Sequence, residues 1–146
     1  DENKCCAVMF EPVQGEGGVL PLKKDFVKAL EVLAKEKDLL LISDEVQTGN
    51  GRTGKLYGYM HFDIEPDIVS TAKGLGGGLP IGATLLGDKV KDVLGAGMHG
   101  STFGGNPVAC AGALSILQRI DDKLLQEVRE KSAFIFESLI VVAPTA

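Results

Sequence analysis

The sequence predicts an α/β fold in which helices flank a mainly parallel β-sheet. Apolar runs at 5–10 and 39–43 have the length and continuity of strands that are buried on both faces. An amphipathic stretch at 23–37 separates them, so strand, helix and strand occupy about 40 residues, which is the spacing of a parallel crossover. Two more short apolar runs, at 68–72 and 81–86, extend the same sheet.

The first helix and the last two strands follow from local patterns. The helix at 23–37 follows Pro21 and has lysines and acids on its outer face. Its apolar residues recur at helical spacing and are Phe26, Val27, Leu30, Leu33 and Ala34. The strands at 68–72 and 81–86 are separated by the glycine-rich stretch 74–80.

The C-terminal third is predicted to be helical. Asn106 is a good N-cap, and Pro107 suits the first helical position. Nearly every residue from 108 to 117 is apolar or small, so we expect this helix to be buried all round. A second helix begins near Asp121, and its predicted inner face consists of Leu124, Val128, Ile135 and Leu139. The end, 141–146, contains no element that would close a domain.

Composition and charge exclude several classes of protein. The 146 residues are enough for one domain, and 45% apolar with 24% charged residues is ordinary for a globular protein. A net charge of -5 without a basic stripe argues against nucleic acid, and no apolar run is long enough to span a membrane. Cys5, Cys6 and Cys110 lack metal-ligand spacing, so we expect no metal but reduced, buried thiols in a cytoplasmic protein.

Two glycine-rich stretches resemble nucleotide motifs without their context. Residues 49–54 match G-x-G-x-x-G, but Gly58 and the lack of helical periodicity argue against the long helix that a dinucleotide site needs. At 73–78 the lysine precedes the glycines, which is the reverse of a P-loop. A small-ligand-binding α/β module without chemistry stays open as an alternative.

Lys73 and Asp44 are the strongest candidates for chemistry. Each follows an apolar strand, and the carboxyl ends of parallel strands are where ligands of open α/β sheets bind. Alone, Lys73 could extend to solvent or attract an anion, and Asp44 could shape a turn. Together they match the minimum that pyridoxal phosphate chemistry requires, a Schiff-base lysine and an aspartate for the pyridinium nitrogen.

Two loops contain further polar candidates. Residues 100–107 combine hydroxyls and glycines just before a predicted helix N-terminus, which suits a phosphate, although Asn106 as a cap explains part of this pattern. Residues 11–18 place two carboxylates and an amide on a loop that proline and glycine constrain. Solvated acids are the simpler explanation for that loop.

Five blocks resemble the class III (ornithine-type) aminotransferases in order and spacing, over about residues 5 to 135. These blocks are 11–18, 44–49, 51–55, 72–74 and 100–107. Within the family, residues 74–83 and Phe103 are most similar to the bacterial acetylornithine branch. The resemblance implies the large domain of the fold type I pyridoxal-phosphate enzymes, in a homodimer whose active sites lie at the interface.

The resemblance also implies roles for six residues. Lys73 would hold pyridoxal 5'-phosphate, Asp44 would pair with its ring nitrogen, and Gln47 would lie near its phenolic oxygen. Thr102, with Ser101 beside it, would reach the phosphate of the partner subunit's cofactor. Glu16 would help to manage an active-site arginine and so to choose between the two substrates.

The implied reaction moves the terminal amino group of N-acetylornithine, or a similar ω-amino donor, to 2-oxoglutarate in arginine biosynthesis. Alternatives are a 4-aminobutyrate or ornithine aminotransferase, and a relative that binds the cofactor without catalysis. The family's N-terminal half and its C-terminal small domain have no match in 1–146. We therefore expect a partial cofactor-binding large domain that is inactive alone, since interior strands would become edges.

Overall fold

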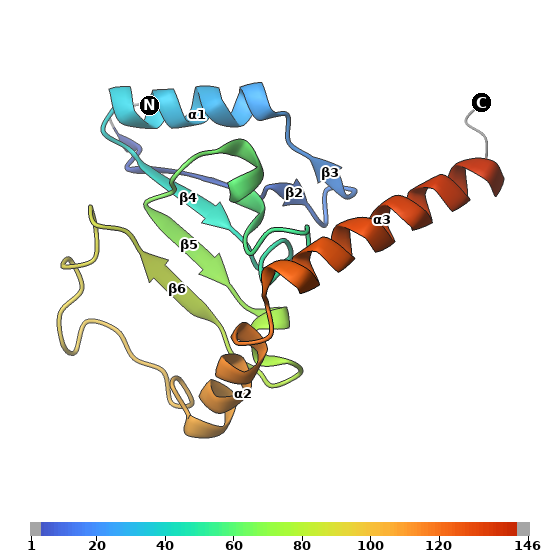
Figure 1. The fold of residues 1–146 in the computed structure, drawn as a ribbon. Helices are drawn as coiled ribbons and strands as arrows, with labels where there is room; N and C mark the ends of the chain where they lie inside the picture. The colour runs from blue at the N-terminus through green and yellow to red at the C-terminus, as the bar shows by residue number, and fades with distance from the viewer. Residues whose placement is uncertain (1–3, 143–146) are drawn as a thin grey trace.

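The computed structural model describes residues 4–142, and a mixed four-stranded sheet forms its centre (Figure 1). In spatial order the strands are β1 (Ala7–Phe10), β4 (Leu40–Asp44), β5 (Ile68–Thr71) and β6 (Ala83–Leu86). β1, β4 and β5 pair in parallel, and β6 pairs with β5 in the antiparallel direction. The predicted α/β fold with a mainly parallel sheet is confirmed.

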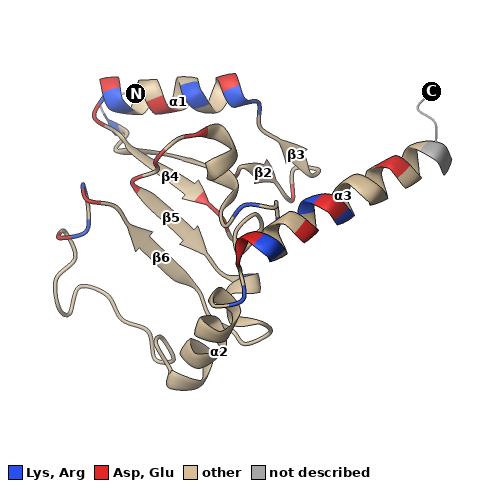
Figure 2. Cartoon of the chain, in the orientation of Figure 1, with Lys and Arg blue, Asp and Glu red and all other residues tan. Residues whose placement is uncertain are grey.

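Helix α1 (Lys24–Glu36) connects β1 to β4 and covers one face of the sheet (Figure 1). Val27 and Ala34 of the predicted apolar stripe are buried, but Phe26 and Leu33 of the same stripe are 52% and 41% exposed, so the stripe is only partly covered. Together with residues of the sheet and of the 3₁₀-helix η2 (Gly58–Phe62), the two buried residues form the core: Phe10, Val27, Ala34, Leu41, Phe62 and Ile64. Charged residues of both signs alternate along α1 and along the first half of the C-terminal helix (Figure 2).

We predict that Leu41→Ala lowers the free energy of unfolding by about 2–5 kcal/mol, because it leaves a cavity inside the core. Leu41 is 3% exposed and is the second residue of β4. The matched control is Leu33→Ala on α1, where the side chain is 41% exposed and its removal opens little space. Urea unfolding of both variants measures the difference, and equal losses would contradict this assignment of the core.

A short hairpin follows β1 and was not predicted. β2 (Val13–Gln14) and β3 (Leu20–Pro21) pair in the antiparallel direction within the stretch that the sequence indicated only as a constrained loop. The backbone N–H groups of Gly18 and Val19 donate to the Gly15 carbonyl at 3.1 and 3.2 Å. Val19 has φ +57°, a strained value for a β-branched residue.

Helix α2 (Pro107–Leu117) begins as predicted, since the Asn106 side chain accepts a hydrogen bond from Ala109 N at 2.9 Å. The prediction that it is buried all round is wrong. Only Ala109 and Ala113 are buried, and Val108 is 68% exposed. α2 packs on one side only, against the 3₁₀-helix η3 (Lys73–Gly76) and Leu79.

Helix α3 (Asp122–Val142) extends away from the sheet (Figure 1). The predicted inner face is also wrong, because Ile135 and Leu139 are exposed and Leu125 instead packs against Gly51. Nothing in residues 4–142 covers the outer half of this helix. The predicted lack of a closing element at 141–146 falls mainly on residues outside the described range.

Two other sequence expectations concern the surface. The three cysteines were expected to be buried, but all three are exposed. Cys110 lies on α2, which packs against the rest of the described chain on one side only, and its side chain is exposed. None of the helices in residues 4–142 is long and apolar enough to cross a membrane.

Candidate active site

The parallel pairing of β4 and β5 brings Asp44 and Lys73 to the same edge of the sheet. Asp44 is the last residue of β4 and stands opposite Ser70 of β5. Lys73 follows the end of β5 by two residues, at the start of η3. Side chains that follow the carboxyl ends of neighbouring parallel strands are therefore close together here, as the sequence predicted.

A cavity of about 170 Å³ opens at this edge. Its lining contains one amine, three carboxylates and one amide, contributed by Glu11, Gly15, Glu16, Asp44, Val46, Gln47 and Lys73. Four of the six predicted site residues, Glu16, Asp44, Gln47 and Lys73, thus line a single small space. Within residues 4–142 the structure gives the Lys73 amine no hydrogen bond or ion pair, so it is available to react with a carbonyl compound in the cavity.

Asp44 is held in place by two hydrogen bonds. Its Oδ1 accepts from Val46 N at 3.0 Å and from Ser70 Oγ at 3.1 Å. The first bond is that of a turn residue, so the simpler explanation for Asp44 also holds. Because both bonds use Oδ1, the second carboxylate oxygen stays available for a cationic ring nitrogen.

Lys73 has a strained backbone conformation. Its φ is +44°, in the left-handed region that costs a residue other than glycine about 1–3 kcal/mol. The chain before it is fixed by Asn50, whose Nδ2 donates to Thr71 Oγ1 at 3.0 Å and to Ala72 O at 3.2 Å. Such strain concentrates where a side chain must be held in one direction for function.

Gln47 and Glu16 enter the cavity from two loops that pack on each other. The Cγ atom of Gln47 lies 3.5 Å from the position that a Cβ atom on Gly15 would occupy. Glu11 Oε2 accepts a hydrogen bond from Gly15 N at 3.0 Å and so shapes the second loop. A Cβ atom at position 15 would therefore be in ordinary van der Waals contact with Gln47.

Ser101 and Thr102 do not lie with the other predicted residues. Both are exposed, and Ser101 lines a different hollow of about 720 Å³ with Thr84 and His99. A phosphate role for these hydroxyls therefore requires a cofactor that another subunit holds. Among residues 4–142, Ser101 and Thr102 do not line the Lys73 cavity.

Sequence reasoning missed Glu45, which is 0% exposed directly beside Asp44. It is hydrogen-bonded on both carboxylate oxygens, and its N–H donates to Ser70 O at 2.8 Å. Burial raises the pKa of Tyr59, and the charge of Glu45 raises it further. The only sequence signal was a second acid immediately after the strand-end aspartate.

The glycines at 49–54 serve packing and turns. A Cβ atom on Gly54 would lie 2.6 Å from Arg129 Cγ, and Gly51 and Gly54 have φ of +84° and +80°. Only the five-residue η2 follows, so the exclusion of a dinucleotide motif is confirmed.

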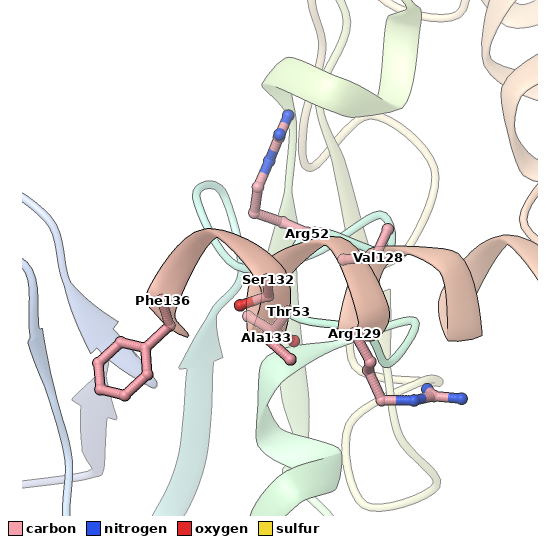
Figure 3. Close-up of a pocket in the computed structure, with 7 residues that line it drawn as sticks. All are labelled: Arg52, Thr53, Val128, Arg129, Ser132, Ala133 and Phe136. Atoms are coloured by element: carbon pink, nitrogen blue, oxygen red, sulfur yellow. The ribbon is translucent and has the colours of Figure 1, made fainter. Parts of the chain in front are cut away.

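A separate hollow of about 410 Å³ lies between this loop and α3, where the side chains of Arg52 and Arg129 extend away from each other (Figure 3). Arg129 Nη1 donates to the Gly54 carbonyl and so ties α3 to the loop. None of the predicted site residues lines this hollow.

Comparison with known proteins places this geometry in a family. The profile of the class-III aminotransferases matches residues 1–144. Acetylornithine aminotransferase of Haemophilus ducreyi is 51% identical over 138 residues, which are 94% of this chain and 35% of that protein. Succinylornithine transaminase of Yersinia pestis is 49% identical over 138 residues, 94% of this chain and 33% of that protein. The chain thus spans about a third of the length of these relatives.

Solved structures agree. An ornithine aminotransferase of Toxoplasma gondii superposes with a TM-score of 0.87 at 41% identity, covering 94% of this chain and 33% of that one. N-acetylornithine aminotransferase of Stenotrophomonas maltophilia gives 0.84 at 40% identity, covering 94% and 35%. The chain belongs to the class III aminotransferase family.

Proposed function

We propose that this chain is the lysine-bearing part of the large domain of a pyridoxal-phosphate-dependent transaminase, and that residues 1–146 function within a longer subunit. The observation that carries the proposal is the pairing of Lys73 and Asp44 in one cavity at the carboxyl edge of β4 and β5. The family membership supports it, and the Toxoplasma gondii relative is described as having PLP at its active site.

The residues of the cavity fit one end of pyridoxal 5'-phosphate. Lys73 Nζ would hold the aldehyde carbon, Asp44 the ring nitrogen, and Gln47 would lie beside the phenolic oxygen. When bound, the cofactor supplies an electron-accepting ring that stabilises negative charge at the substrate carbon. Ser101 and Thr102 would hold the phosphate of the partner subunit's cofactor in a homodimer.

Lys73 would also move the proton that transamination requires. With a substrate amine attached in its place, the Nζ of Lys73 would remain in the same small cavity, where it could take the proton from the substrate carbon and deliver it to the carbon of the cofactor. Asp44, fixed through Oδ1, would hold a negative charge beside the ring while the reaction proceeds. Glu16 would influence which of the two substrates the site accepts.

The proposed amino donor is N-acetylornithine, with 2-oxoglutarate as the acceptor, in a cytoplasmic enzyme of arginine biosynthesis. Relatives named acetylornithine aminotransferase at about 50% identity support this donor. Succinylornithine and ornithine are the second candidates, because similarly close relatives and superposable structures carry those names. All three donors present a terminal amine on the same carbon skeleton.

The test is to add pyridoxal phosphate, reduce with borohydride and locate any pyridoxyl-lysine by peptide mass spectrometry. We expect the label on Lys73, both in the longer subunit and, where this chain assembles its cavity unaided, in the chain itself. Lys89, which pairs with Asp38 at 2.8 Å on the surface, is the internal control and should stay unlabelled. Label scattered over lysines in the longer subunit would overturn the proposal.

A further inference from the structure

Glu45 has a buried carboxylate, and each of its two oxygens accepts two hydrogen bonds. Its Oε1 accepts from Ser43 Oγ at 3.0 Å and from Tyr59 N at 2.7 Å. Its Oε2 accepts from Thr48 Oγ1 at 2.5 Å and from Gly58 N at 2.7 Å. Each oxygen thus receives one hydroxyl and one backbone N–H, and the side chain is 0% exposed. No substrate or cofactor can reach it directly.

These bonds tie together three segments of the chain. Ser43 belongs to the end of β4, Thr48 to the turn that follows, and Gly58 to the start of η2. The turn from 44 to 48 carries Asp44 and Gln47, which both line the Lys73 cavity. The carboxylate of Glu45 therefore joins this turn to β4 and η2, and it is not itself among the residues that line the cavity.

The packing around the carboxylate leaves little room for adjustment. A Cβ atom on Gly58 would lie 2.9 Å from Thr48 Cβ and 3.1 Å from Glu45 Oε2. A Cβ atom on Gly49 would lie 2.6 Å from the Glu45 carbonyl oxygen. Glycine at these two positions lets the backbone approach closely, so there is little free space around the Glu45 carboxylate.

We propose that Glu45 is a positioning residue for the reaction, which fixes Asp44 and Gln47 at the distance the cofactor needs. The inference rests on the proposed function and adds a residue that touches neither cofactor nor substrate. Glu45 would act by holding in place its neighbour Asp44 and the turn that carries Gln47.

Glu45→Gln tests the inference with a nearly isosteric change. The amide has one NH2 group, and whichever side it occupies, it faces a backbone N–H, that of Tyr59 or that of Gly58. The hydroxyls of Ser43 and Thr48 can rotate to accept, but a backbone N–H cannot. The turn must therefore shift, and with it Asp44.

Asp67→Ala is the matched control. Asp67 Oδ2 accepts a hydrogen bond from Leu41 N at 2.8 Å, so this substitution also leaves a backbone N–H without its acceptor, here one of β4. The affected N–H lies near the other end of the strand, away from the cavity. Both variants are made in the longer transaminase subunit and compared well below their melting temperatures.

We expect both variants to melt several degrees earlier, and only Glu45→Gln to lose catalysis. Its kcat should fall roughly 10- to 100-fold, the effect of a small misplacement of a reacting group, while KM changes little. The absorbance band of enzyme-bound pyridoxal phosphate should also shift in Glu45→Gln alone. A folded Glu45→Gln enzyme with the kcat and absorbance of Asp67→Ala would overturn the inference.

If Glu45→Gln does not fold, Thr48→Val tests whether Glu45 is a positioning residue. It keeps the shape of the buried side chain and removes one donor to Oε2. A several-fold loss of kcat with unchanged KM supports positioning, and an unchanged kcat overturns it. A wild-type subunit without label on Lys73 and without transamination is a different result, since it refutes the proposed function itself.

Discussion

Lys73→Ala is expected to abolish transamination by the longer subunit and to remove the borohydride-trapped cofactor. No other lysine among the described residues lines the cavity, so no second amine can replace it. Losing both the attachment point and the proton carrier should lower the rate by about 10⁴-fold or more. Turnover of N-acetylornithine with 2-oxoglutarate measures the rate, and peptide mass spectrometry measures the label.

Two further substitutions separate chemistry from folding. Lys89→Ala removes a surface lysine that is ion-paired with Asp38 and should leave both readouts unchanged. Lys73→Gly should be as inactive as Lys73→Ala but more stable, because glycine adopts the φ of +44° without strain. Normal turnover by Lys73→Ala would remove the central residue of the proposal.

The part of the site that the sequence predicted depends on a rule of topology. Asp44 and Lys73 each follow an apolar strand, and parallel pairing of β4 with β5 is enough to bring their side chains to one edge. The strands and α1 were predictable because their apolar patterns are local. The position of Lys73 could be predicted without knowing of η3, because η3 begins at Lys73 and turns the chain only after it.

Burial of the C-terminal helices could not be predicted from their sequence. The apolar run in α2 indicates that this helix has no polar face, but not which neighbours cover it. Within residues 4–142 it packs on one side, against η3 and Leu79, so side chains such as Leu114, 57% exposed, remain in solvent. The pattern in α3 likewise predicts a helix but does not identify Leu125 as the residue that contacts Gly51.

The hairpin β2–β3 and the role of Glu45 were missed for another reason. Two-residue strands have no periodicity to detect, and the turn between them includes Val19 at a φ that β-branched residues avoid. Glu45 takes two of its donors from Gly58 and Tyr59, which are 13 and 14 residues away in sequence. Pairings of that kind depend on the folded path of the chain rather than on a motif.

Asp44→Asn is expected to retain the cofactor but to lose catalysis by about 10²- to 10³-fold, the scale for removing one fixed electrostatic group from an active site. Asparagine has the shape of aspartate, and its Oδ1 can still accept from Val46 N and Ser70 Oγ. The turn and the cavity should therefore survive. What disappears is the negative charge beside the ring nitrogen, and with it the stabilisation of charge that develops in the ring.

Ser70→Ala is the control that separates charge from geometry at this position. It removes the hydroxyl that donates to Asp44 Oδ1 at 3.1 Å, but it leaves the carboxylate and the Val46 bond in place. We expect a loss of only a few-fold in kcat, with label on Lys73 retained in both variants. If Asp44→Asn turned over at nearly the wild-type rate, Asp44 would be a turn residue only. If Ser70→Ala lost as much activity as Asp44→Asn, orientation of the carboxylate, rather than its charge, would be what the reaction needs.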